Sequence, residues 1–234
     1  MTPLEGKIFN SPDEVIEETL RFGFLPFFRN EIHGFSIEEH TPSELWFSDV
    51  NDGPWEWKGP IVRTGKVAYA KLLRNKAVYV SPQLLPHLIN VRRSSKQLTY
   101  DEERVLKAIV ANESMLSTEI RTECGFGPHG SCAADRMLLA SLNGTDAPRA
   151  SLDTVLTRLQ MSGRIVVSDF EYNTDKKGHP YGWGIARYST PEILYADWFS
   201  LPDATPAQSH ALLSEKLLAL FPSIGTKIAN KLIG

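Results

Sequence analysis

Hydrophobic and polar positions follow their most regular pattern in residues 151–188, where a helical spacing is followed by two strand-like runs. Ser151 is a typical N-cap, and Gly163 is a typical C-terminal stop. Between them, apolar residues occupy the i, i+3, i+4 and i+7 positions of one helical face: Leu152, Val155, Leu156 and Leu159. Residues 164–172 and 181–188 are rich in β-branched and aromatic side chains and flank a charged turn. The segment therefore predicts a helix that leads into a β-hairpin.

Similar patterns precede this segment. A helix is predicted at 100–112, with three acidic residues in its first turn, and a short helix follows from about Ser117. Three helices and a hairpin in this order are typical of a winged helix-turn-helix domain, which we place at residues 99–198. An insertion near 125–150 separates the second and third helices, where such domains normally have a tight turn.

The first 95 residues mix helical and strand-like patterns and predict a separate α+β domain. Helices are expected at 12–22, 69–74 and 82–89, and a strand at 76–81. Residues 30–58 are acidic and interrupted by proline and glycine, which predicts an irregular, solvated loop. A metal or acid–base site is the alternative, built from its carboxylates and two histidines, among them Glu38, Glu39 and His40. The basic stretch at 92–96 predicts a domain linker, with a phosphate-contacting arm as the alternative.

Residues 203–234 carry two amphipathic patterns around a short turn and predict a helical hairpin packed on the rest of the chain. The predicted fold class is therefore α+β, with a winged helix-turn-helix domain, an N-terminal α+β domain (1–95) and C-terminal helices.

Composition limits the possible functions. A length of 234 residues allows one large domain or two modest ones, and the net charge of −3 is unlike that of a dedicated DNA-binding protein. No apolar run approaches the roughly 18 residues of a membrane span, so we expect no membrane partner. No secretory signal is recognisable, and the two cysteines favour a reduced, cytoplasmic location.

Tryptophans and carboxylates are concentrated in residues 46–58. Three indoles could form the wall of a pocket: Trp46, Trp55 and Trp57. Three carboxylates beside them could act as a general base: Asp49, Asp52 and Glu56. A well-packed core with Glu56 pointing outward explains the same pattern equally well.

Basic residues suggest where nucleic acid could bind. Residues 149–187 contain six basic and four acidic side chains, so any positive surface there is small. Arg158 could face a groove of DNA from the predicted third helix, and Arg187 lies on the second strand of the hairpin. The hairpin tip carries three further residues that could contact phosphates: Lys176, Lys177 and His179.

Metal and cofactor sites are not indicated. Cys124, His129 and Cys132 lie close together in the sequence, but a structural zinc site needs four ligands and no fourth is nearby. We therefore expect no metal and no cofactor.

Four segments carry a family resemblance: 44–49 (ELWFSD), 53–60 (GPWEWKGP), 157–161 (TRLQM) and 180–184 (PYGWG). With them the chain resembles the bacterial AlkZ-related proteins over most of its length. The family name implies a distant relation to the AlkZ/YcaQ alkylpurine DNA glycosylases, which are built from tandem winged helices. Their catalytic signature is Gln-x-Gln or Gln-x-Asp. None of the glutamines here has Gln or Asp two residues later: Gln83, Gln97, Gln160 and Gln208.

Three functions follow as alternatives. The first is a nucleic-acid-binding winged-helix protein, with double-stranded DNA as its partner and a relation to DNA repair. The second is a glycosylase or hydrolase that acts on a flipped base near Trp55 and Trp57. The third is a protein-interaction module, which could form a homodimer. The sequence leaves open whether the protein is an enzyme.

Overall fold

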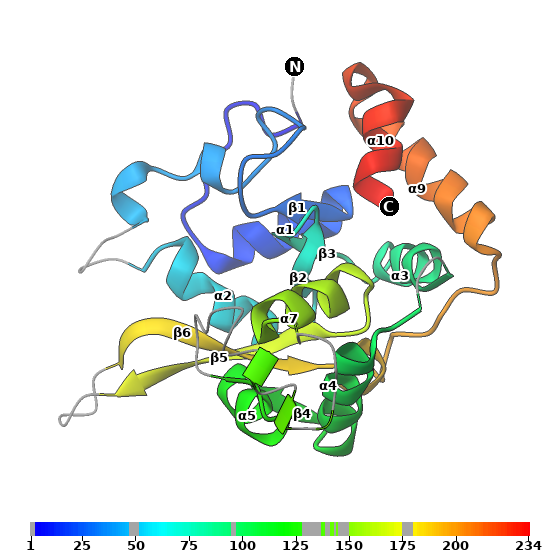
Figure 1. Ribbon diagram of the computed structural model, residues 1–234. Helices are drawn as coiled ribbons and strands as arrows, with labels where there is room; N and C mark the ends of the chain where they lie inside the picture. Colours follow the sequence, from blue (N-terminus) through cyan, green and yellow to red (C-terminus); the bar gives the residue numbers. More distant parts are fainter. Residues whose placement is uncertain are drawn as a thin grey trace.

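Two three-stranded antiparallel sheets organise the chain (Figure 1). The computed structural model describes residues 3–46, 52–94, 97–127, 137–138, 141–142, 144, 150–174 and 180–234. The fold is mixed α+β, and one connected hydrophobic core includes residues of both sheets and of the C-terminal helices. None of the described helices has the length and apolarity needed to cross a membrane. The predicted domain boundaries stay predictions.

The first sheet has the strand order β1-β3-β2. Its elements and their helices have these bounds: α1 (Pro12–Phe22), β1 (Phe24–Pro26), α2 (Pro54–Arg63), β2 (Ala68–Leu73), β3 (Lys76–Val80) and α3 (Leu85–Ser94), with two 3-10 turns at Glu38–His40 and Ser43–Leu45. The predicted helix at 12–22 is confirmed as α1. The Ser11 hydroxyl caps its N-terminus by accepting a hydrogen bond from Glu14 N.

The predicted helix at 69–74 is wrong, because this segment forms β2 and turns directly into β3. The turn residues Arg74 and Asn75 both adopt left-handed conformations, with φ of 48° and 65°. Such a turn usually carries glycine, so the sequence gives no turn signal here. The strand is buried on both faces except at Lys71, which removes the alternation that would identify a strand.

The predicted irregular loop at 30–58 is also too long, because α2 begins at Pro54. Proline fits the first position of a helix, where its missing N–H costs nothing. The Glu56 side chain closes the same end, since Glu56 Oε2 accepts a hydrogen bond of 2.9 Å from Gly53 N. A residue that the sequence suggested as a breaker therefore starts a helix.

The second sheet has the strand order β4-β6-β5 and confirms the predicted helix and hairpin after Ser151. Its elements have these bounds: α4 (Tyr100–Ala111), β4 (Ser114–Leu116), α5 (Ser117–Glu123), α7 (Leu152–Met161), β5 (Val166–Thr174) and β6 (Pro180–Ser189). The Ser151 hydroxyl caps α7 by accepting from Thr154 N. Most of the predicted insertion near 125–150 lies outside the described residues.

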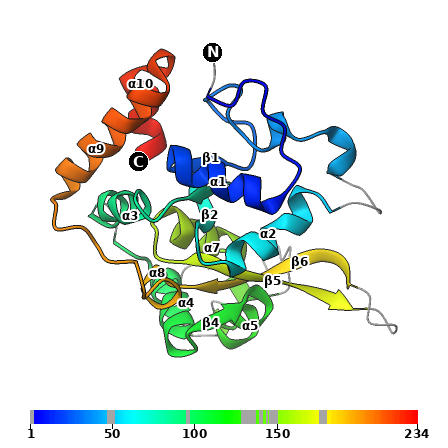
Figure 2. The ribbon, with the colours of Figure 1, turned by 180° about the vertical axis from the view of Figure 1, so that it is seen from behind.

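The C-terminal helices pack on α3. Their bounds are α8 (Pro191–Leu194), α9 (Pro206–Leu220), a 3-10 turn (Pro222–Ile224) and α10 (Gly225–Ile233). Asn90 of α3 donates to Ala204 O and to the buried Ser209 hydroxyl of α9, at 2.8 and 2.9 Å. Two views from opposite sides show α9 and α10 at one end of the molecule, while strands β5 and β6 extend toward the other (Figures 1 and 2).

Arg92 joins three helices. Its guanidinium is buried and donates to Met161 O at the end of α7 and to Leu232 O and Ile233 O at the end of α10, at 2.8 to 3.0 Å. Burial lowers the pKa of Arg92 to about 10, so the group stays charged at neutral pH. The prediction of a linker at 92–96 is therefore wrong for Arg92, which belongs to α3 and to the core.

Two contacts join the elements around the second sheet to those around the first, one between α7 and β2 and the other between α2 and β5. Gln160 of α7 is buried, and its Oε1 accepts a hydrogen bond of 3.0 Å from Lys71 N on the edge strand β2. Lys58 of α2 is 7% exposed, and its Nζ lies 4.3 Å from the centre of the Trp55 ring and 4.5 Å from that of Phe170 on β5. A lysine ammonium at these distances is attracted by both rings.

Replacing Arg92 tests the three-helix junction. Arg92→Leu leaves three helix-terminal carbonyls without their buried donor, so we expect the free energy of unfolding to fall by roughly 3 kcal/mol or more. Urea denaturation measures the change. Arg63→Leu is the control, because Arg63 forms an exposed ion pair of 2.7 Å with Asp169, and its loss should cost about 1 kcal/mol or less. Equal losses in the two variants would refute the special role of Arg92.

Burial of Lys58 predicts an unusual pH dependence of stability. Desolvation lowers the pKa of Lys58 to about 8, although the Glu56 carboxylate partly opposes this. The unfolded chain, with an ordinary lysine pKa of about 10.4, binds more protons between these values, so stability rises with pH through this window. Burial raises the pKa of Tyr69 and Tyr79, which lowers stability only above about pH 10.

Urea denaturation at about pH 7.5 and about pH 9.5 should therefore show a gain of roughly 1–2 kcal/mol in the parent protein. Lys58→Met removes the ammonium and keeps most of the packing volume, so the gain should disappear in that variant. A gain of the same size in both proteins would show that another group causes it.

Candidate functional site

The three tryptophans that were predicted to form a pocket wall do not all lie at the same place in the structure. Trp46 and Trp55 lie together with Phe28 beside an open cleft of about 570 Å³. The ring centres are 5.8 Å apart for Trp46 and Trp55, and 6.0 to 6.4 Å apart for Phe28 and either indole. Trp57, by contrast, is 4% exposed and packs in the core. Two of the three predicted indoles therefore border the cleft.

Charged side chains complete the lining of the cleft. Arg29 is an exposed residue of the lining, and Glu38 and Glu39 come from the 3-10 turn that follows the first strand. Glu38 Oε2 accepts a hydrogen bond of 2.8 Å from Arg29 N. Thr41 and Ser43 provide hydroxyl groups in the same lining. The cleft thus combines an aromatic wall with two carboxylates and one guanidinium.

Glu39 is held as a carboxylate. Its burial alone would raise the pKa, but hydrogen bonds from Ser36 Oγ and Gly34 N, at 2.7 and 2.9 Å, outweigh this effect. The charges of Arg29 and His40 act in the same direction, and the pKa of Glu39 lies below its ordinary value. A carboxylate with a lowered pKa binds cations and hydrogen-bond donors well but is a weak general base.

Of the three predicted catalytic carboxylates, the two that the structure describes, Asp52 and Glu56, are not among the cleft-lining residues. Asp49 lies outside the described residues, and Asp52 is exposed. Glu56 is exposed and caps α2 through Gly53 N. Among the described residues, the carboxylates that line the cleft with the indoles are Glu38 and Glu39. In the sequence, only their place in the acidic loop indicated them as candidates for a site. Their meeting with Phe28 and the tryptophans depends on contacts between distant segments.

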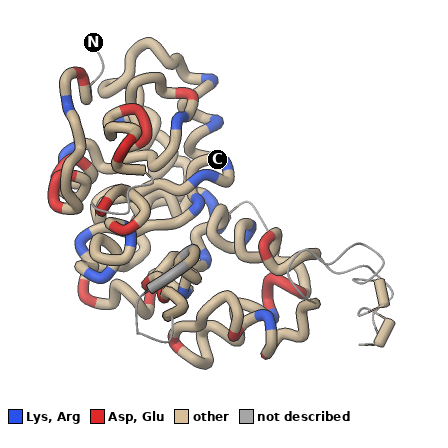
Figure 3. The backbone as a smooth tube through the Cα atoms, turned by 90° about the vertical axis from the view of Figure 1, so that its left-hand side faces the viewer, with Lys and Arg blue, Asp and Glu red and all other residues tan. Residues whose placement is uncertain are grey.

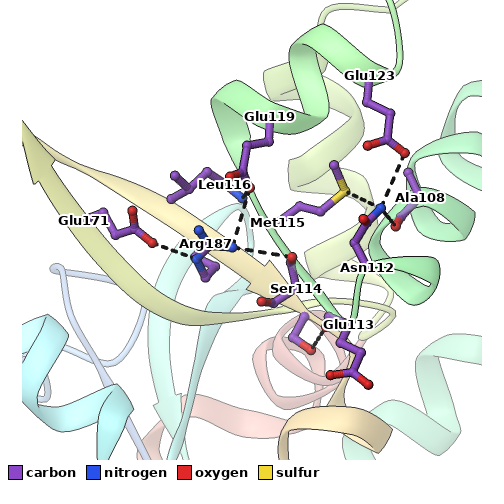
Figure 4. Close-up of polar contacts among 11 residues, drawn as sticks. Ala108, Asn112, Glu113, Ser114, Met115, Leu116, Glu119, Glu123, Glu171 and Arg187 are labelled. Carbon is purple, nitrogen blue, oxygen red and sulfur yellow. Dashed lines mark hydrogen bonds and ion pairs between the residues drawn. The ribbon is translucent and has the colours of Figure 1, made fainter.

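The residues that were predicted to contact nucleic acid also differ in their surroundings. Arg158 projects from α7 with its side chain 50% exposed, and its Nη1 is 4.0 Å from Glu102 Oε1. Arg187 of β6 lies between two carboxylates, with Nε 2.8 Å from Glu171 Oε1 and Nη1 3.5 Å from Glu119 Oε2 (Figure 4). Its charge is largely neutralised there. Lys176, Lys177 and His179 lie outside the described residues.

The β2–β3 hairpin lies along the C-terminal half of α7. Lys71 Nζ is 3.5 Å from the Thr157 hydroxyl, and Asn75 N is 3.2 Å from Met161 Sδ. Lys76 Nζ, just beyond the turn, donates to Arg29 O at 2.6 Å. A series of contacts therefore leads from α7 along the hairpin to Arg29 and the cleft.

Four exposed cations lie on this path, and sequence reasoning missed all of them: Arg29, Lys71, Arg74 and Lys76. Arg74 forms an ion pair with Glu31, whereas the contacts described for Lys71 and Lys76 involve no carboxylate. Arg29 is far from the other three in the sequence, so no local charge run marked the four together. Along the backbone shown in Figure 3, basic and acidic positions are interspersed in the described part of the chain.

In the part of the chain that the structure describes, no group of three or more His, Cys, Asp or Glu residues is arranged to hold a metal ion. Cys124 is buried, and its predicted neighbours His129 and Cys132 lie outside the described residues.

Comparisons with known proteins identify the family but no individual relative. Searches of curated proteins and of solved structures found no match. The resemblance that the tryptophan-rich segments suggested is confirmed at the level of the family. A family model described as "AlkZ related" matches residues 9–234, nearly the whole chain, and the chain therefore belongs to the AlkZ-related family.

Proposed function

We propose that this protein binds double-stranded DNA through a winged helix formed by α4, β4, α5, α7, β5 and β6. The observation that carries the proposal is the arrangement of these elements. Helices α4, α5 and α7 accompany a sheet of order β4-β6-β5, and the β5–β6 hairpin extends away from the body (Figure 1). In this fold the third helix enters the major groove and the hairpin contacts the flanking backbone.

Helix α7 takes the role of the recognition helix. Thr154 and Arg158 are exposed on it, whereas Thr157 and Met161 contact the β2–β3 hairpin. The first turn of α7 and the face that carries Arg158 are therefore accessible, and residues near the N-terminal end of a recognition helix usually contact base edges. Lys71 lies beside α7 at Thr157 and can contact a phosphate of the same duplex.

The charge distribution implies modest affinity with a strong dependence on salt. Asp153 is exposed in the first turn of α7, and the neutralised Arg187 adds little positive charge to the wing. Phosphate contacts by a few cations dominate such binding. A role in DNA repair is part of the proposal, since the family name points to it. The hairpin-tip contacts of Lys176, Lys177 and His179 stay predictions.

A double variant tests the proposal. Arg158→Gln combined with Lys71→Gln removes two phosphate contacts, which should reduce the slope of log affinity against log salt by roughly 1.8. Fluorescence anisotropy with a labelled duplex between about 50 and about 200 mM salt measures this slope. Glutamine is chosen because a carboxylate at position 158 would face Glu102.

Lys107→Gln is the matched control, because Lys107 is an exposed cation of α4 on the side away from the buried Val105 and Ile109. It should leave the affinity unchanged. No duplex binding by the parent protein at low salt would refute the proposal, as would equal losses in the double variant and the control. Sedimentation of the free protein would show whether a homodimer covers α7 instead.

A further inference from the structure

The aromatic cleft has the size and wall of a site for a flat ring. Its volume of about 570 Å³ falls within the range of small-molecule sites, which is roughly 300–1,000 Å³. Trp46, Trp55 and Phe28 contact one another, so a ligand cannot enter between them and must lie against their common surface. Stacking of a nucleobase on such a surface is tolerant of sequence and contributes about 1–3 kcal/mol per base.

Acidic and basic side chains both belong to the lining of the cleft. The carboxylates of Glu38 and Glu39 repel phosphate and can accept hydrogen bonds from amino groups, and Glu39 is held in its ionised form. Arg29 of the lining and Lys76, whose Nζ donates to Arg29 O, are exposed cations that attract phosphate. Aromatic rings, hydrogen-bond acceptors and exposed cations together suit a base and the phosphates that flank it.

Contacts connect this cleft to the proposed duplex site. Lys71 reaches Thr157 on α7, the hairpin turn reaches Met161, and Lys76 reaches Arg29. Contacts of the hairpin residues Lys71, Asn75 and Lys76 thus extend from the recognition helix to Arg29, which lines the cleft. A positive path with an aromatic platform is the usual arrangement for binding single-stranded nucleic acid.

We propose that the cleft and the cations Arg29 and Lys76 bind an unpaired, single-stranded segment of nucleic acid, next to the duplex held by α7. This inference rests on the proposed function for its context, although single-strand binding can be measured alone. Because the carboxylates inside the cleft accept hydrogen bonds from exocyclic amino groups, adenine and cytosine should bind better than thymine, which has no such group.

Titration with short single strands tests the proposal. Homopolymers of deoxyadenosine, deoxycytidine and thymidine, each roughly ten nucleotides long, are added at low salt. Intrinsic tryptophan fluorescence and the anisotropy of labelled strands are followed together. We expect quenching and binding by the adenine and cytosine strands, several-fold weaker binding by the thymine strand, and loss of affinity as salt increases.

Two variants separate the contributions. Trp46→Leu removes part of the stacking surface and should weaken single-strand binding about fivefold or more. Arg29→Gln with Lys76→Gln should weaken it and flatten its salt dependence. The controls are Trp198→Phe, because Trp198 donates to Gly65 O and is not among the cleft residues, and the exposed pair Lys107→Gln with Lys231→Gln. Thermal unfolding shows that each variant is folded.

The outcomes distinguish this inference from the proposed function. Absence of single-strand binding at low salt, or binding that Trp46→Leu and the Arg29/Lys76 variant leave unchanged, overturns the inference even if duplex binding holds. Equal quenching by free deoxynucleoside monophosphates at the same nucleotide concentration also overturns it, because the cleft would then bind free nucleotides. Single-strand binding without duplex binding would support this site and refute the role of α7.

Discussion

The junction at Arg92 is the constraint on which the rest of the structure depends. One guanidinium on α3 supplies donors to the last carbonyls of α7 and α10, which otherwise have no partner inside their own helices. A cation is also favoured at the negative end of a helix dipole. Because a buried charge is stable only with all its hydrogen bonds made, the relative positions of these three helices are closely fixed. The C-terminal helices thereby help to orient the helix that we propose for DNA recognition.

Fixing α7 in this way brings its C-terminal half against the first sheet. The Gln160 Oε1 accepts a hydrogen bond from Lys71 N on the edge strand β2, and its Nε2 donates to Leu156 O. No second glutamine or aspartate follows two residues after this glutamine, so it does not complete the Gln-x-Gln or Gln-x-Asp signature of the AlkZ/YcaQ glycosylases, and here it is 1% exposed and bonded to backbone. Its position explains why the surface beside α7 is composite, with cations from the β2–β3 hairpin as well as from the helix.

Sequence patterns predicted the elements whose signals are local and failed where distant contacts decide. Caps and periodicity identified α1 and α7 because Ser11 and Ser151 act within one turn of their helices. The β2–β3 hairpin was missed because its turn uses Arg74 and Asn75 in place of glycine. At the candidate site, the indoles of Trp46 and Trp55 were predicted, but the carboxylates that meet them were not. Only tertiary packing separates Trp57, in the core, from its neighbour Trp55.

Arginine and lysine side chains differ in their partners, and this difference allows the proposed narrow binding surface on a chain of net charge −3. Described arginines mostly face carboxylates or backbone carbonyls, as Arg187 and Arg92 show, because a planar guanidinium donates several hydrogen bonds at once. Lys71 and Lys76 contact only neutral oxygens in the contacts described, a hydroxyl and a carbonyl, and keep their charge exposed. Their full charge is available to a phosphate. The net charge of the chain therefore does not argue against the proposed sites, since these need only a few exposed cations: Arg29, Lys71, Lys76 and Arg158.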